Sequence, residues 1–97
     1  MNRIVVLVTL MLCGLPPTHA QEAQRLAAPC AICHGTGGRA VTKDVVPLAG
    51  LPREHIASQM RAFRDGQRPA TVMHQIAKGY SDSQIDTLAA WFAAQKR

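Results

Sequence analysis

Two cysteines and a histidine stand together in the pentapeptide Cys30-Ala-Ile-Cys33-His34. This C-x-x-C-H pattern is the attachment motif of haem c. The two-residue gap sets the sulfurs at the separation of the two porphyrin vinyl groups, to which the thiols add as thioethers. The histidine that follows directly is placed beneath the iron. We therefore expect one covalent haem c, with thioethers at Cys30 and Cys33 and His34 as an axial iron ligand.

Three other uses of a C-x-x-C pair compete with this interpretation. A thioredoxin-like pair opens a helix after a strand in a βαβ unit, and no strand pattern is visible here. A structural zinc site needs four ligands, so His55 or His74 would have to join the motif, and the adjacent Cys33 and His34 chelate one ion poorly. A plain disulfide would leave His34 without a role. Haem attachment uses all three residues.

The second axial ligand must come from another part of the chain, where Met60, Met73, His55 and His74 are the candidates. Met60 shares an apolar helix face and is expected in the core, whereas His55 is expected on the surface. Met73 lies in a predicted loop just before a short helical turn. Met/His ligation is typical of cytochromes c and raises the potential. We predict Met73, and His74, Met60 or an open position remain alternatives.

A proximal histidine usually donates its second ring N–H to a carbonyl, which fixes the tautomer. The segment Val46-Pro47-Leu48-Ala49-Gly50 is a rigid apolar loop whose carbonyls have no ladder to join. We predict that the Pro47 carbonyl accepts this bond from His34. The alternative is that Pro47 only shapes a turn.

The first twenty residues have the pattern of a cleaved export signal. After a polar start with Arg3, the run from Ile4 to Leu15 is almost wholly apolar. That run is shorter than the roughly 20 apolar residues that span a bilayer, and Thr18-His19-Ala20 is close to an A-x-A cleavage site. We predict cleavage after Ala20, giving a signal peptide (1–20) and one periplasmic haem domain (21–97) without membrane insertion. An uncleaved anchor is the alternative.

Cleavage would leave a small, mildly basic domain with only two thiols. It removes Cys13 and Arg3, so ten Lys and Arg remain against six Asp and Glu. These basic residues are scattered and lack interleaved aromatics, which argues against a nucleic-acid surface. Arg61, Arg64 and Arg68 share a helix face or its extension, and are expected to hold a haem propionate, to face an acidic partner or simply to be solvated.

Helical periodicity predicts an all-α domain with three main helices. A short helix is expected over 21–28, interrupted by Pro29 just before the cysteines. The second spans 53–65, where Ile56, Met60 and Phe63 share one face and Gly66 closes the helix. A single helical turn is expected over 75–78.

The last helix has the clearest local pattern. Ser81 is a good N-cap, and Gln84 three residues later completes a capping box. Tyr80 and Ile85 flank the cap in the positions of a hydrophobic staple. Long loops separate the three helices, and in a domain this small they are expected to wrap around the haem.

Taken together, the motifs resemble the class I cytochromes c of the small bacterial type. The match runs through C-A-I-C-H-G, V-P-x-L-A-G-L-P, the Arg/Phe helix, a Met loop and S-D-x-Q-I with L-A-A-W-F. The stretches R-P-A-T-V-M and I-A-K-G-Y-S-D are most similar to the haem subunit of flavocytochrome c sulfide dehydrogenase. The resemblance implies that Met73 is the axial ligand and that Pro47 pairs with His34. His74, where a small residue is expected, and Pro29 depart from the pattern.

The resemblance also implies function. In that family the haem subunit binds a sulfide-oxidising flavoprotein and passes its electrons onward. We therefore expect a non-catalytic electron carrier, with a flavoprotein subunit as its partner. A free shuttle to a terminal oxidase or another reductase is the second hypothesis, and a haem sensor with an open sixth position is the third.

Overall fold

The computed structural model describes residues 14–97. The apolar part of the expected signal peptide therefore lies almost entirely outside the described residues. The described part contains helices and no strand, which confirms the all-α prediction. In chain order the elements are α2 (His19–Ala27), the 3₁₀ helix η1 (Ala28–Cys30), α3 (Ala31–His34), the 3₁₀ helix η2 (Thr36–Gly38), α4 (Arg53–Arg64), α5 (Met73–Ala77) and α6 (Asp82–Ala93).

Helix α2 begins earlier than the sequence predicts. Thr18 caps it: the Thr18 side chain accepts from the Gln21 N–H, and the Gln21 side chain accepts from the Thr18 N–H. The α-helical geometry ends at Ala27, and Pro29 lies in the first turn of η1. The predicted interruption before Cys30 is thus present, as a tightening into a 3₁₀ turn.

Helices α4 and α6 agree closely with the prediction. Ser81 and Gln84 form the expected capping box at the start of α6. At the end of α4, the Gln67 N–H bonds to the Ala62 carbonyl and the Gly66 N–H to the Phe63 carbonyl. This pair of bonds is a Schellman motif, which places Gly66 at the predicted closing position.

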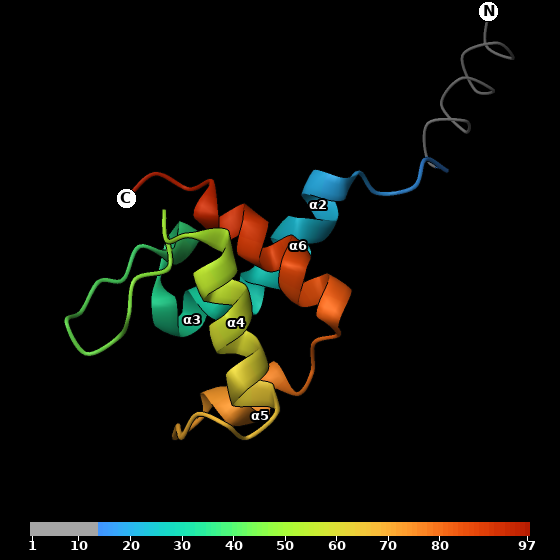
Figure 1. Cartoon of the computed structure of the whole chain (residues 1–97). Helices are drawn as coiled ribbons and strands as arrows, with labels where there is room; N and C mark the ends of the chain where they lie inside the picture. The colour runs from blue at the N-terminus through green and yellow to red at the C-terminus, as the bar shows by residue number, and fades with distance from the viewer. Residues whose placement is uncertain (1–13) are drawn as a thin grey trace, which may run out of the picture.

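Helix α6 is the centre of the packing, since it lies against both α2 and α4 (Figure 1). Its apolar face supplies four buried residues, of which Phe92, Ile85 and Leu88 are the largest fully buried side chains. Met60 of α4 is buried in the same cluster, as predicted. Helix α5 packs against α4 and lies beside its C-terminal end (Figure 1).

All three arginines of the α4 face and its extension make contacts within the protein. Arg61 makes ion pairs with Asp82 and Asp86 of α6, at 3.1 and 2.8 Å, and Arg64 pairs with Asp82 at 2.7 Å. Arg68 lies over the Phe63 ring, 4.6 Å from its centroid. These contacts connect α4 to α6 and to the loop after α4.

No helix among residues 14–97 is long and apolar enough to cross a membrane. The longest connection, from residue 39 to residue 52, extends away from the helices and returns to them at α4 (Figure 1). Its return is fixed by backbone bonds from the Leu48 and Ala49 N–H groups to the Gly38 carbonyl and from the Gly50 N–H to the Phe92 carbonyl.

Candidate haem-attachment site

The two cysteines of the motif lie on one right-handed turn that joins η1 to α3. Cys30 has αR backbone angles and caps α3. Residues three apart in a helical turn lie on the same side, so Cys30 and Cys33 present their thiols in the same general direction. Both thiols are free. Cys30 is half-buried against the core cluster, whereas Cys33 is exposed.

Gly35 turns the chain sharply after His34. Its φ is +84°, and a Cβ at this position would lie 1.9 Å from the Arg39 carbonyl oxygen. Only glycine permits this approach. The turn ends α3 directly after the histidine and sends the chain into the loop that later returns to the His34 ring.

The His34 ring is held by that returning loop. Its Nδ1 lies 2.7 Å from the carbonyl oxygen of Val46. A carbonyl can only accept, so Nδ1 carries a proton, and in the neutral ring Nε2 then keeps its lone pair. This is the tautomer that an iron ligand requires.

The acceptor differs by one residue from the prediction, which was the carbonyl of Pro47. The predicted loop segment is correct, but the carbonyl that faces His34 belongs to Val46. Neighbouring carbonyls of an extended chain point in opposite directions, and the residue before a proline is biased towards extended backbone. Only one of the two can therefore face the ring, and the sequence does not say which.

Met73 is the first residue of α5, although it was expected in the preceding loop. The Gln75 and Ile76 N–H groups both bond to the Val72 carbonyl, which starts the helix at Met73. The Met73 side chain is half-buried and packs on the same core cluster as Cys30. Met73 on α5 and Cys30 in the motif therefore pack against the same core cluster.

The other ligand candidates are distributed differently. Met60 belongs to the core, His55 is exposed on α4, and His74 is half-buried beside Met73. No group of three or more His, Cys, Asp and Glu residues gathers within the described part of the chain.

Large apolar side chains are exposed on the segments that carry the candidate ligands. Ile32, inside the motif, is 86% exposed, and Val46, whose carbonyl holds His34, is 57% exposed. Val72 and Ile76, on either side of Met73, are 54% and 37% exposed. A protein of this size gains by covering such surface. A flat apolar porphyrin held at Cys30 and Cys33 fits this arrangement.

A cavity of about 320 Å³ lies beside the returning loop. Pro47, Ala49 and Leu51 line it, together with the two cationic side chains Arg39 and Arg97. Arg97 also donates to the Gly50 carbonyl. The loop that holds His34 is therefore bordered by positive charge.

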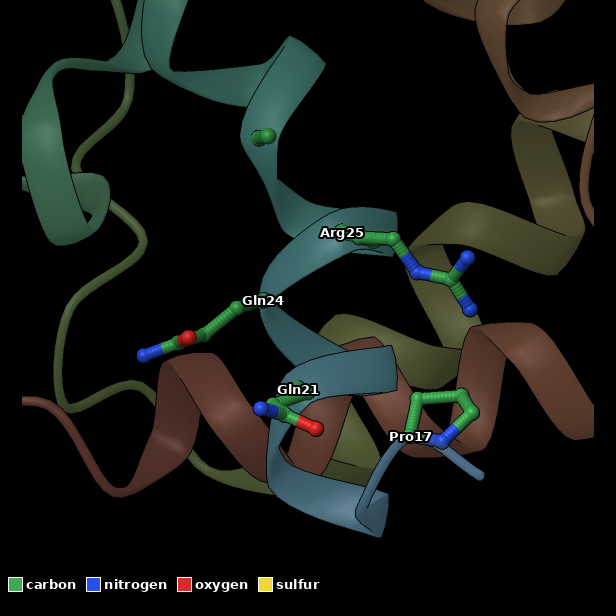
Figure 2. Close-up of a pocket in the computed structure, with 5 residues that line it drawn as sticks. Pro17, Gln21, Gln24 and Arg25 are labelled. Atoms are coloured by element: carbon green, nitrogen blue, oxygen red, sulfur yellow. The ribbon is translucent and has the colours of Figure 1, made fainter. Parts of the chain in front are cut away.

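A second depression, on α2, has a different character. Figure 2 shows the Gln24 and Arg25 side chains pointing to opposite sides of the helix, so they do not converge on a common point. Neither a thiol nor an imidazole lines this depression, whose residues are Pro17, Gln21, Gln24, Arg25 and Ala28. It therefore has none of the groups that attach or ligate a haem.

Burial raises the pKa of the Cys30 thiol, although hydrogen bonds with the Tyr80 hydroxyl and the backbone oppose that rise. The Tyr80 pKa is also raised, first by burial and then by the neighbouring Cys30. The Tyr80 hydroxyl also donates to the Leu26 carbonyl. Sequence analysis missed this contact between Tyr80, Cys30 and Leu26, because no local pattern relates residues so far apart in the chain.

Comparison with known proteins identifies the family. The chain is 36% identical over 70 residues to cytochrome c-554(548) of Halomonas halodenitrificans, covering 69% of this chain and 84% of that protein. The chain belongs to the class I c-type cytochromes. This family carries haem c, the group that the C-x-x-C-H motif predicts.

Two further relatives of this cytochrome are redox subunits or acceptors. This cytochrome is 38% identical over 98 residues to the thiosulfate dehydrogenase electron acceptor of Thiomonas intermedia, and the match covers 99% of this chain. It is 35% identical over 80 residues to the cytochrome subunit of sulfide dehydrogenase of Chlorobaculum tepidum, covering 81% of this chain and 71% of that subunit.

The match to the Thiomonas relative covers only part of that protein. The chain spans about half the length of the Thiomonas relative, 45%. No family model matches the chain.

Proposed function

We propose that this cytochrome carries single electrons between redox proteins through one haem c, attached by thioethers at Cys30 and Cys33. The observation that supports this most directly is the 2.7 Å bond from His34 Nδ1 to the Val46 carbonyl. It leaves Nε2 free as a ligand on the same turn as both thiols. When bound, the haem supplies the reversible Fe(II)/Fe(III) couple.

The protein's own residues would set how the haem is held. Cys30 and Cys33 would attach it, and His34 would be one of the residues that hold the iron. Met73 would also hold the iron, which would raise the potential, and His74 beside it is the alternative. The apolar side chains that flank these ligands would exclude water. No nucleophile or general base is needed, so the proposed role is electron transfer and not catalysis.

The electron donor that we propose is a sulfide-oxidising flavoprotein, to which this chain would bind as the haem subunit. The similarity to the cytochrome subunit of sulfide dehydrogenase of Chlorobaculum tepidum supports this assignment. A free shuttle to another oxidase or reductase is the second candidate. The similarity to cytochrome c-554(548) and to a thiosulfate dehydrogenase electron acceptor favours it.

We further propose that the chain is exported to the periplasm and cleaved after Ala20. The short apolar run before Pro16 and Pro17 supports a cleaved signal.

A spectrum of the protein isolated natively from the periplasm tests these proposals together. After size exclusion, a flavin band that co-elutes with the haem and is bleached by sulfide is expected for the dehydrogenase subunit. A haem-only spectrum at the size of a small monomer would instead favour the free shuttle.

Acid–acetone extraction then tests the attachment. The haem should remain with the wild-type chain and should be released from the Cys30→Ala/Cys33→Ala double variant. Extraction of haem from the wild type would contradict covalent attachment.

A further inference from the structure

The Tyr80 hydroxyl links two segments that carry opposite parts of the candidate site. It donates to the Leu26 carbonyl at 2.8 Å, across 54 residues of sequence. Leu26 lies in the last turn of α2, four residues before Cys30. Tyr80 lies seven residues after Met73, in the connection between α5 and α6.

The same hydroxyl lies beside the Cys30 side chain, and each group shifts the pKa of the other. Tyrosine has a single hydroxyl proton, which the Leu26 carbonyl receives. Formation of a thioether removes the thiol proton and leaves the bond to Leu26 unchanged, so the hydroxyl stays fixed beside the sulfur.

Tyr80 is connected to Met73 by a short, continuously hydrogen-bonded segment. The Tyr80 N–H bonds to the Ala77 carbonyl and the Gly79 N–H to the Ile76 carbonyl, both at 3.1 Å. Ala77 is fully buried. The ring of Tyr80 and the side chain of Met73 pack on the same core cluster. Movement of Met73 is therefore coupled to the anchoring of Tyr80.

We propose that Tyr80 is a positioning residue that fastens the Met73 segment to the Cys30 segment, and thereby sets how firmly Met73 holds the iron. This role rests on the proposed function, because it requires a haem attached at Cys30 and ligated by Met73. Tyr80 itself does not touch the iron and takes no part in electron transfer.

Competition with imidazole tests the proposal, since exogenous imidazole binds ferric haem only where Met73 has left. The test variant is Tyr80→Phe, which removes only the hydroxyl. The matched control is Thr87→Val, because the half-buried Thr87 donates to the Ser83 carbonyl within α6 alone. Imidazole affinity is titrated on the holoproteins, and global unfolding is followed by far-UV circular dichroism.

We expect Tyr80→Phe to bind imidazole about three- to tenfold more tightly than the wild type, as loss of one hydrogen bond predicts. Thr87→Val should bind it as the wild type does. Equal affinity in Tyr80→Phe and the wild type would overturn the positioning role, even if the variant unfolds more easily. A wild-type protein that lacks a covalent-haem spectrum would overturn the proposed function and this role together.

Discussion

Asp82 Oδ1 lies 2.7 Å from Arg64 Nη1 and joins the first turn of α6 to the last turn of α4. Hydrogen bonds from Arg64 and then from Arg61 hold the pKa of the Asp82 carboxyl below its ordinary value. A carboxyl whose pKa is lower in the folded state stabilises the fold above its unfolded-state pKa. That contribution disappears as the pH falls through the folded-state pKa.

Replacing Asp82 by Asn should therefore lower stability at neutral pH and change its pH dependence. We expect the difference in urea midpoint between wild type and Asp82→Asn to be constant above about pH 5 and to shrink below about pH 4, where an unpaired Asp protonates. The pair is exposed, so the effect is small. Asp44→Asn, in the exposed loop, is the control. A difference that persists unchanged at pH 2 would contradict the ion-pair explanation.

The axial role of Met73 can be separated from the packing role of other residues. Met73→Ala should abolish the far-red sulfur-to-iron absorption band of the oxidised protein. Met60→Leu should keep the band and cost less than about 1.5 kcal/mol of stability, because it conserves volume in the core. His74→Ala should also keep it. If the band survives in Met73→Ala, the ligand assignment is wrong.

The loop that holds His34 should influence the potential. Pro47→Ala frees the backbone next to Val46 and should lower the unfolding free energy by about 0.4–1 kcal/mol. A looser bond from Nδ1 makes His34 a less basic ligand, so the midpoint potential should rise. Spectroelectrochemistry measures it. Pro52→Ala, at the start of α4, is the control, and an equal potential in both variants would argue against the effect.

Gly38 is a position where stability depends on the absence of a side chain. Its φ is +78°, and a Cβ there would lie 2.8 Å from Phe92 Cδ1 and 2.9 Å from the Ala49 nitrogen. Gly38→Ala should therefore cost at least about 2 kcal/mol, combining backbone strain with overpacking. Gly66 has a similar φ of +74° but nothing within 4 Å.

Gly66→Ala isolates the backbone contribution and should cost about 1–2 kcal/mol. Thermal or urea unfolding of both variants measures the difference between them. Equal losses would show that the packing around Phe92 adjusts without cost.

The sequence predicted α4 and α6 well because their ends are encoded locally. Ser81, Gln84 and Gly66 act on backbone groups within a few residues of themselves, and the apolar faces have a clear period. The start of α5 has no capping side chain, so the sequence predicts a loop at its first residue, Met73. The capping box of Thr18 is hidden in the sequence, because Thr18 also fits the pattern of the predicted cleavage site.

Only those parts of the candidate site whose residues lie close together in the sequence could be predicted. The C-x-x-C-H motif and the loop that holds His34 were both recognised. Which of the Val46 and Pro47 carbonyls faces the His34 ring depends on the backbone dihedral angles of the loop. The sequence does not determine those angles accurately enough to tell the two carbonyls apart. The Tyr80–Leu26 bond depends on how α2 docks on the rest of the fold, and no local pattern reports that arrangement.

The capping box of α2 would impose an order of events on the proposed cleavage. The predicted cut, between Ala20 and Gln21, lies inside the first turn of this helix, and Thr18 and Gln21 bond to each other across it. A protease requires a segment that can open, so the cut has to precede the formation of this turn. Such a cut would remove the Thr18 cap, and the remaining helix would depend on the packing of Ala23 and Ala27 to stay folded.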